Sequence, residues 1–271
     1  MSDADALRAF GKQVDFGRTA SDYTTHRAGF PAEFFAALSD RGYLTPGQHA
    51  VDLGTGTGTI ARGLARAGLH VTALDIASDL LTAAAALDAE ADVQITYKDA
   101  QSEDTGLPDH SADLVTAGQC WHWFDRPRAA SEANRLLRLG GRILIAHFDW
   151  LPLPGSLVAS TEALILRYNP DWAGAGGTGL YPDWLSDLAE AGFQKIETTS
   201  FDVSQNYSHD AWRGRIRASA GVAASLTPEA VTKFDAELAA MMECCFKDDP
   251  ARIPHRVWWV TGFKPQDPPH K

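Results

Sequence analysis

The sequence predicts an α/β fold built on a doubly wound, largely parallel sheet of about seven strands, with late helical insertions that form a lid. Two observations predict it. Between residues 49 and 148, short apolar runs alternate with stretches that carry apolar residues at helical spacing, which is the pattern of successive β-α-β units. A glycine-rich segment at residues 54–58 joins the first apolar run to the first helical stretch.

The elements of this first part follow one another closely. Strands are expected at residues 49–54, 70–75, 93–100, 112–119 and 141–148. Helices are expected at residues 59–68, 77–90 and 128–141. Two of the helical stretches end in Gly, the residue that most easily takes the left-handed conformation at a helix end.

The regular alternation of strand-like and helical segments ends after residue 149. Residues 150–180 mix Pro, Gly and aromatic residues around one short helical run and are too long for an ordinary connector. A helix and a strand return at residues 183–203, a mostly helical stretch follows, and residues 255–265 favour a last strand. We expect one domain over residues 1–271. Its predicted core covers about 31–149, 181–203 and 255–265, and its predicted cap segments cover about 1–30, 150–180 and 204–254.

Charge and composition narrow the class of partner. The chain has 24 Lys and Arg against 35 Asp and Glu, a net charge of -11, which disfavours nucleic acid and anionic membrane surfaces. No segment approaches the roughly 20 apolar residues of a membrane span, and the N-terminus carries no apolar signal core. We therefore expect a cytoplasmic protein with a small-molecule substrate. The three cysteines show no C-x-x-C spacing, so we expect no metal site, and the oligomeric state stays open.

The glycine segment suggests a bound cofactor. It brings backbone N–H groups and a helix N-terminus to the carboxyl edge of the sheet, where polar or anionic groups bind. Asp75 closes the second strand, where a carboxylate can accept hydrogen bonds from both hydroxyls of an adenosine ribose. Two cofactor classes share these features, nicotinamide dinucleotides and S-adenosylmethionine, and a tight turn alone would also explain the glycines.

The spacing of the glycines separates the two classes. Dinucleotide sites use G-x-G-x-x-G, whereas this loop reads G-x-G-x-G, with Thr59 at the dinucleotide position of the last Gly and Asp52 two residues before the loop. This pattern resembles the first motif of the class I S-adenosylmethionine-dependent methyltransferases. The resemblance implies a Rossmann-like fold with a reversed C-terminal strand. Residues 73–84, 97–108, 110–125 and 132–148 resemble the motifs that follow it, so the resemblance covers roughly residues 15–148.

The resemblance implies a set of cofactor residues. Asp52 would help hold the methionine end beside the glycine backbone and Gln119. Asp75 would bind the ribose, and Ile76 and residues 99–100 would flank the adenine. With two residues from the N-terminal segment, the predicted cofactor set is Tyr23, Arg27, Asp52, Gly54, Thr55, Gly56, Gly58, Asp75, Ile76, Asp99, Ala100 and Gln119.

The sequence signals for acceptor binding are less specific than those for cofactor binding. Residues 16–31 resemble the segment that precedes the fold in the small-molecule branch of the family, similar to the ubiquinone, menaquinone and trans-aconitate methyltransferases, and would lie over the cofactor or acceptor. His122, just past the fourth strand, is the candidate general base, although it and its aromatic neighbours also fit a packed turn. The remaining candidate acceptor contacts are Phe16, His26, Trp121, Trp123, His147 and Trp150.

Several residues of the insertions allow two interpretations. Trp150, Trp172, Trp184 and Trp212 fit either an acceptor wall or the packing of a helical cap. The arginines at 213, 215 and 217 fit either an anionic substrate or a solvated helix face.

Taken with the family resemblance, the sequence predicts an enzyme, a methyltransferase that moves a methyl group in line from S-adenosylmethionine to a small metabolite, with O, N or C as the acceptor atom. The alternatives are an NAD(P)-dependent oxidoreductase and a cofactor-binding protein without catalysis.

Overall fold

The computed structural model describes residues 29–266. These residues form two compact units. The first, here the sheet unit, contains residues 29–147, 181–200 and 258–266. The second, here the helical unit, contains residues 148–180 and 201–257.

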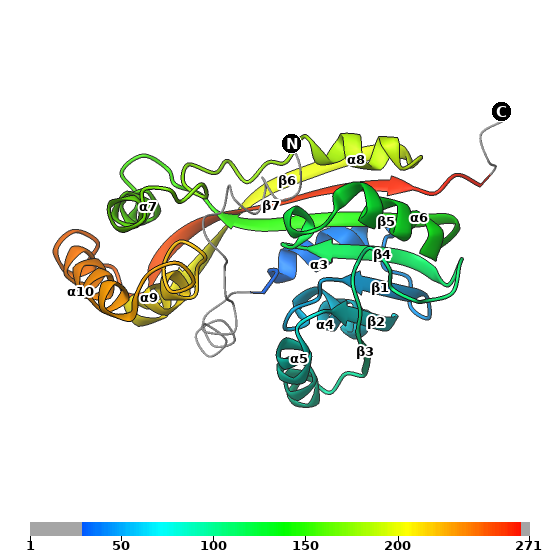
Figure 1. Cartoon of the computed structure of the whole chain (residues 1–271), viewed down its shortest axis with the longest axis horizontal. Helices are drawn as coiled ribbons and strands as arrows, with labels where there is room; N and C mark the ends of the chain where they lie inside the picture. The colour runs from blue at the N-terminus through cyan, green and yellow to red at the C-terminus, as the bar shows by residue number, and fades with distance from the viewer. Residues whose placement is uncertain (1–28, 267–271) are drawn as a thin grey trace. The chain divides into compact units, whose positions relative to one another are not determined.

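A seven-stranded sheet organises the chain in the order β3-β2-β1-β4-β5-β7-β6 (Figure 1). Its strands are β1 (His49–Leu53), β2 (His70–Asp75), β3 (Ile95–Asp99), β4 (Ala112–Gly118), β5 (Leu137–Trp150), β6 (Gln194–Tyr207) and β7 (Ala251–Phe263). The pairs β3–β2, β2–β1, β1–β4 and β4–β5 are parallel. The predicted parallel α/β sheet is therefore confirmed.

The last strand runs against the others. The N–H of Gly140 donates to the carbonyl of Lys264, and the N–H of Leu151 donates to the carbonyl of Pro254, each over 2.9 Å. Residue numbers thus rise along β5 where they fall along β7, which makes these neighbours antiparallel. The predicted reversal of the C-terminal strand is confirmed.

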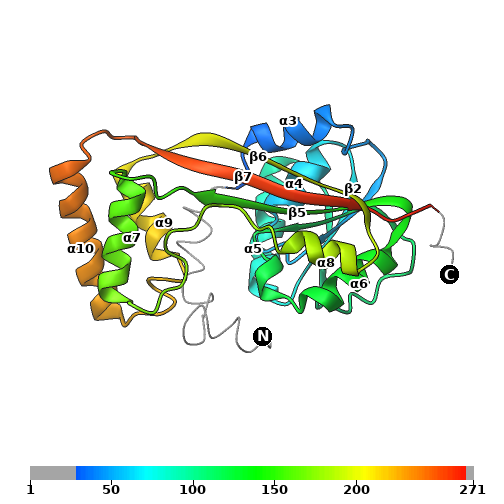
Figure 2. The ribbon, with the colours of Figure 1, turned by 90° about the horizontal axis from the view of Figure 1, so that it is seen from above.

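Two groups of helices flank the strands of the sheet unit, with α3 and the pair α6 and α8 on opposite sides (Figure 2). The helices are α3 (Ala32–Asp40), α4 (Thr59–Arg66), α5 (Ser78–Ala91), α6 (Arg126–Leu136) and α8 (Trp184–Glu190). On one side, α4 approaches α3 so closely that a Cβ at Gly63 would lie 2.0 Å from the ring of Phe35. On the other, the side-chain amide of Asn134 in α6 donates to the carbonyl of Ala191 after α8.

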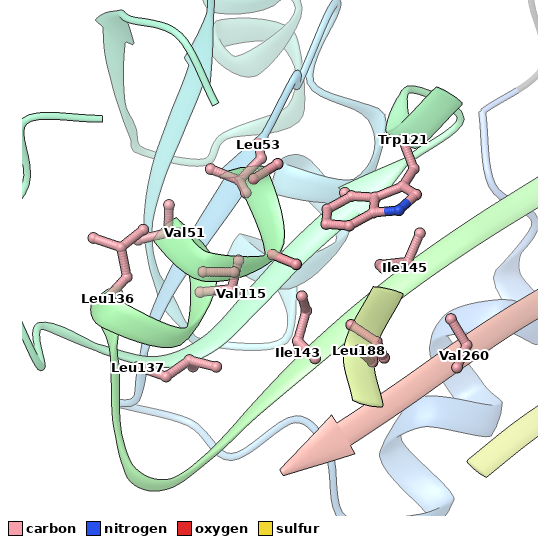
Figure 3. Close-up of a cluster of buried hydrophobic side chains, with 14 of the residues drawn as sticks. Val51, Leu53, Val115, Trp121, Leu136, Leu137, Ile143, Ile145, Leu188 and Val260 are labelled. Atoms are coloured by element: carbon pink, nitrogen blue, oxygen red, sulfur yellow. The ribbon is translucent and has the colours of Figure 1, made fainter. Parts of the chain in front are cut away.

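An apolar core fills the α6 and α8 side of the sheet (Figure 3). Alternate residues of β1, β4 and β5 enter it, as the two-residue period of a strand requires. These side chains pack against Trp121 and residues of α6, α8 and β7. The labelled members are Val51, Leu53, Val115, Trp121, Leu136, Leu137, Ile143, Ile145, Leu188 and Val260.

Some predicted boundaries change. The helix expected to end in the Gly-Gly pair stops at Leu136, and β5 begins at Leu137 instead of residue 141. The pairing of β4 with β5 shifts register after Ala112, and Gly140 has a φ of 77°. A bulge with a left-handed glycine therefore lets the strand begin earlier than a helical reading of the sequence suggests.

The late insertions are helical, as predicted. The helical unit contains α7 (Leu157–Tyr168), α9 (His209–Arg217) and α10 (Pro228–Cys245). Each begins at a Ser or Thr whose side chain accepts a hydrogen bond from the backbone N–H three residues later, at Ser156, Ser208 and Thr227. Within residues 29–266, no helix is long and apolar enough to cross a membrane.

Candidate functional site

The glycine loop joins β1 to α4 through three residues with left-handed backbones. Gly54, Gly56 and Gly58 have φ values of 61°, 55° and 77°, which residues with a Cβ rarely adopt. Two of them also lack room for a side chain. A Cβ at Gly54 would lie 2.8 Å from Phe124, and one at Gly58 would lie 2.8 Å from the Tyr97 hydroxyl.

Gly56 is different: apart from its two chain neighbours, no atom of the described residues lies within 4 Å of the position that its Cβ would take. Residues 29–266 therefore leave the space in front of Gly56 open. Its N–H donates to Asp75 Oδ2 over 2.8 Å, and the N–H of Ala77 donates to Asp75 Oδ1 over 3.0 Å. Each carboxylate oxygen can accept two hydrogen bonds, so Asp75 retains acceptor capacity beside the open space.

Asp52 lies behind the loop. Its side chain is buried, and its two oxygens accept hydrogen bonds of 2.6 Å from the hydroxyls of Thr55 and Thr116. Burial raises the pKa of Asp52 to about 6, against the opposing effect of these hydrogen bonds. The structure thus gives Asp52 two partners inside the protein, and its predicted contact with the methionine end stays a prediction.

A second polar group supports the loop from α4 and α5, and it was not predicted. Arg62 forms an ion pair with Asp88, and its other terminal nitrogen donates to the carbonyl of Thr57 over 2.6 Å. The hydroxyl of Tyr97 donates to Asp88 over 2.8 Å, which with burial raises the pKa of this tyrosine. The sequence carried one signal for this group: Asp88 is a charged residue four positions after Ala84, on the buried face of α5.

The predicted adenine residues lie at the neighbouring strand ends. Ile76 follows β2 and is 70% exposed, unusual for a large apolar side chain. Asp99, the register partner of Asp75, accepts a hydrogen bond from the Ser78 hydroxyl over 3.0 Å. The N–H of Ala100 donates to the carbonyl of Asp75 over 3.3 Å. The edge thus combines an exposed apolar face with carboxylates.

The end of β4 adjoins the loop. Gln119 has a φ of 59°, and its N–H donates to the carbonyl of Ala146 over 2.9 Å. The thiol of Cys120 contacts the carbonyl of Leu53 at 3.2 Å. Trp121 has no exposed surface, and its indole N–H donates to Asp187 over 2.9 Å. The expected contact of Trp121 with an acceptor is therefore corrected: Trp121 is a core residue.

The two histidines predicted for the acceptor lie together. The ring centroids of His122 and His147 are 5.4 Å apart, and His122 also contacts Trp123 at 4.7 Å. His147 packs against Tyr181 at 4.3 Å, a residue that the sequence analysis did not single out. Tyr181 stacks on Trp184 at 4.2 Å. His122, His147, Tyr181 and Trp184 form what we call the histidine–aromatic cluster.

Five of the predicted residues do not belong to the described part of the sheet unit. Trp150 belongs to the helical unit, where its indole N–H donates to the buried Glu162 over 2.7 Å and Arg215 lies over its ring. The predicted residues Phe16, Tyr23, His26 and Arg27 lie outside the described residues. Among residues 29–266, no group of three or more His, Cys, Asp or Glu is arranged to hold a metal ion.

Comparison with known proteins places this site in a family. Residues 51–145, which contain the glycine loop and the ends of β1, β2, β3 and β4, match a family model described as a methyltransferase domain. A ubiquinone biosynthesis O-methyltransferase from Xanthomonas campestris pv. campestris is 31% identical over 178 residues, 64% of this chain and 72% of that protein. This chain belongs to the class I S-adenosylmethionine-dependent methyltransferases.

A second relative and two solved structures extend this comparison. An uncharacterized methyltransferase from Mycobacterium bovis is 34% identical over 132 residues, 48% of this chain and 50% of that protein. A phosphoethanolamine N-methyltransferase from Haemonchus contortus, solved with S-adenosyl-L-methionine, has a TM-score of 0.55 at 21% identity and covers 98% of this chain and 60% of its own. The YcgJ protein from Bacillus subtilis has a TM-score of 0.57 at 14% identity over 88% of this chain and all of its own. These two structures show the same fold.

The residues present fit the methyl donor. S-adenosylmethionine has a ribose diol, an apolar adenine face and a cationic sulfonium. The open space at Gly56, the spare acceptor capacity of Asp75 and the exposed Ile76 offer partners for these groups. The methyltransferase therefore uses S-adenosylmethionine as its cofactor, and the alternative of a nicotinamide-dependent oxidoreductase is excluded.

Proposed function

We propose that the methyltransferase binds its donor at the edge formed by the glycine loop and the ends of β2, β3 and β4, and methylates a small-molecule acceptor. The open space at Gly56, bordered by the carboxylate of Asp75, is the observation that carries this proposal. Asp75 would accept from the ribose hydroxyls, Ile76 and residues 99–100 would flank the adenine, and Gln119 would lie beside the methionine end.

The chemistry requires little from the chain beyond orientation. When bound, S-adenosylmethionine supplies an electrophilic methyl group on a sulfonium. The chain must hold an acceptor atom in line behind that methyl group, and such orientation contributes about 7–11 kcal/mol to lowering a barrier. A hydroxyl acceptor gains further from a base that takes its proton.

We propose a hydroxyl acceptor with His122 as the base. The support is twofold: the relatives named as O-methyltransferases, and the position of His122 directly after β4 in contact with His147. Histidine is the side chain best suited to accept a proton near neutral pH. Tyr181, which is partly exposed and stacks on the buried Trp184 beside His147, suits contact with a planar acceptor.

The two-unit division supports a further part of the proposal. The sheet unit would be the methyltransferase core, and the helical unit would contain the predicted cap segments, both within one domain. Because of the net charge of -11, we propose no nucleic-acid substrate. A cytoplasmic location also stays a prediction, which cell fractionation would test.

Ligand binding and product identification test the proposal. S-adenosylhomocysteine at a hundred times its dissociation constant should stabilise the protein by about 2.7 kcal/mol, and NAD should not. Incubation with methyl-labelled S-adenosylmethionine and a fractionated cell extract should label a small molecule at oxygen. A shift with NAD alone would contradict the donor site, and label on nitrogen, on carbon or in a macromolecule would contradict the acceptor assignment.

A further inference from the structure

One buried carboxylate connects the glycine loop to β4. Asp52 and Thr116 are direct partners in the register of the parallel β1–β4 pair, so their side chains point to the same face of the sheet. The Thr116 hydroxyl donates to Asp52 Oδ1, and the hydroxyl of Thr55, a loop residue, donates to Oδ2, each over 2.6 Å. Asp52 thus joins a strand to the loop that follows its own strand.

Water is nearly excluded from this group. The exposed fractions are 0% for Thr116, 2% for Asp52 and 8% for Thr55. The backbone N–H of Ala61, in the first turn of α4, also stabilises the charged carboxylate. A buried charge that loses a donor remains poorly solvated, so solvent cannot readily replace the Thr116 hydroxyl.

The loop beyond Thr55 is held from the other side. The N–H of Thr55 donates to the carbonyl of Leu74, and the N–H of Gly56 donates to Asp75, each over 2.8 Å. The side chain of Thr55 is fixed through Asp52, whereas the backbone of the loop is fixed by β2. The conformation of Gly56 therefore depends on hydrogen bonds from both neighbours of β1 in the sheet.

We propose that Thr116 is a positioning residue. Through Asp52, it holds Thr55 and Gly56 in the conformation that binds the methyl donor. This inference rests on the proposed donor site. It adds a second role to the one that the sequence predicted for Asp52, because the two oxygens of Asp52 accept hydrogen bonds from the loop and from β4.

The charge of Asp52 gives the inference a pH-dependent signature. Burial raises the pKa of Asp52 to about 6, and among residues 29–266 the ionisable groups that act on Asp52 are Asp75 and Tyr97. A nearby cation favours the ionised carboxylate, and S-adenosylmethionine carries a sulfonium that S-adenosylhomocysteine lacks. Affinity for S-adenosylmethionine should therefore fall more steeply than affinity for S-adenosylhomocysteine as the pH is lowered through 6.

Calorimetric titration of the full chain with S-adenosylhomocysteine at neutral pH tests the role of Thr116. Thr116→Val should raise the dissociation constant by about tenfold, the equivalent of one hydrogen bond to a charged group. Thr116→Ser should restore it. Thr261→Val is the matched control, because Thr261 is also fully buried and its hydroxyl donates to the carbonyl of Ile143 over 2.7 Å. It should lose stability and keep its affinity.

The outcomes separate this inference from the donor site itself. If Asp75→Ala abolishes binding and Thr116→Val does not weaken it, the positioning role is wrong and the site stands. If Asp75→Ala leaves binding unchanged, the proposed site is wrong. Equal losses of affinity in the Thr116 and Thr261 variants would mean that Thr116 has only a structural role, and the positioning role would be wrong. Should Thr116→Val not fold, parallel pH profiles for the two ligands in the wild type would overturn the inference.

Discussion

Replacing Gly56 by Ala offers the sharpest test of the donor site, because the structure supplies a matched control. Gly56 has a φ of 55° and Gly42 has a φ of 68°. Apart from chain neighbours, no atom of the described part of the chain lies within 4 Å of a Cβ at either position, so neither substitution creates a clash there. The two variants differ mainly in the position of the substituted residue. Gly42 follows α3 and precedes β1, at the amino end of the strands, whereas Gly56 follows the carboxyl end of β1.

The magnitude follows from the backbone. A left-handed conformation costs a residue with a Cβ roughly 1–2 kcal/mol, so both variants should lose about this much stability. For a chain of this size, each kcal/mol lowers the melting temperature by about 2–4 °C. Only the methyl group at residue 56 enters the open space at the loop, and we expect it to weaken S-adenosylhomocysteine binding at least tenfold, about 1.4 kcal/mol.

Differential scanning fluorimetry and calorimetric titration measure the two effects separately. Gly42→Ala should melt earlier and bind S-adenosylhomocysteine like the wild type. Gly56→Ala should melt equally early and bind poorly. Wild-type affinity in Gly56→Ala would refute the assignment of this space to the donor, whatever its melting temperature.

Three other predictions concern single side chains. Asp75→Ala should weaken S-adenosylhomocysteine binding at least tenfold while the circular dichroism spectrum is retained, and an unchanged affinity would remove Asp75 from the ribose role. His122→Ala should lower the rate of methyl transfer by about a hundredfold or more with little change in donor affinity; full turnover would exclude a base at this position. Burial alone would raise the pKa of Glu132, but hydrogen bonds from Arg135 and Thr105 to its carboxylate lower that pKa from 4.5 to about 2. The charged form of Glu132 therefore contributes stability above pH 4.5 that is lost as the pH falls towards 2. Glu132→Gln should flatten this part of the curve of unfolding free energy against pH. Parallel curves for the variant and the wild type would contradict this role of Glu132.

Much of the fold and of the donor edge could be predicted because their signals are local. Strands of apolar residues, glycines with fixed spacing and a carboxylate at a strand end follow from nearest-neighbour chemistry. The boundaries of β5 could not be predicted, because a bulge and a left-handed glycine depend on the pairing strand. Trp121 illustrates the same limit: its place in the sequence suggests a pocket wall, and only packing against α8 shows that it is buried.

The sequence by itself determined the α/β class, the family and the edge at which the donor site is proposed, since backbone freedom and strand order are encoded residue by residue. Only the tertiary structure decided which groups support that edge. Asp52 and Thr116 are 64 residues apart, and a hydroxyl inside an apolar strand becomes informative only once the register places it opposite a buried carboxylate. The same holds for Tyr181 and His147, which meet through packing that no local pattern records. Burial turns such contacts into strong constraints, because water cannot replace a lost partner.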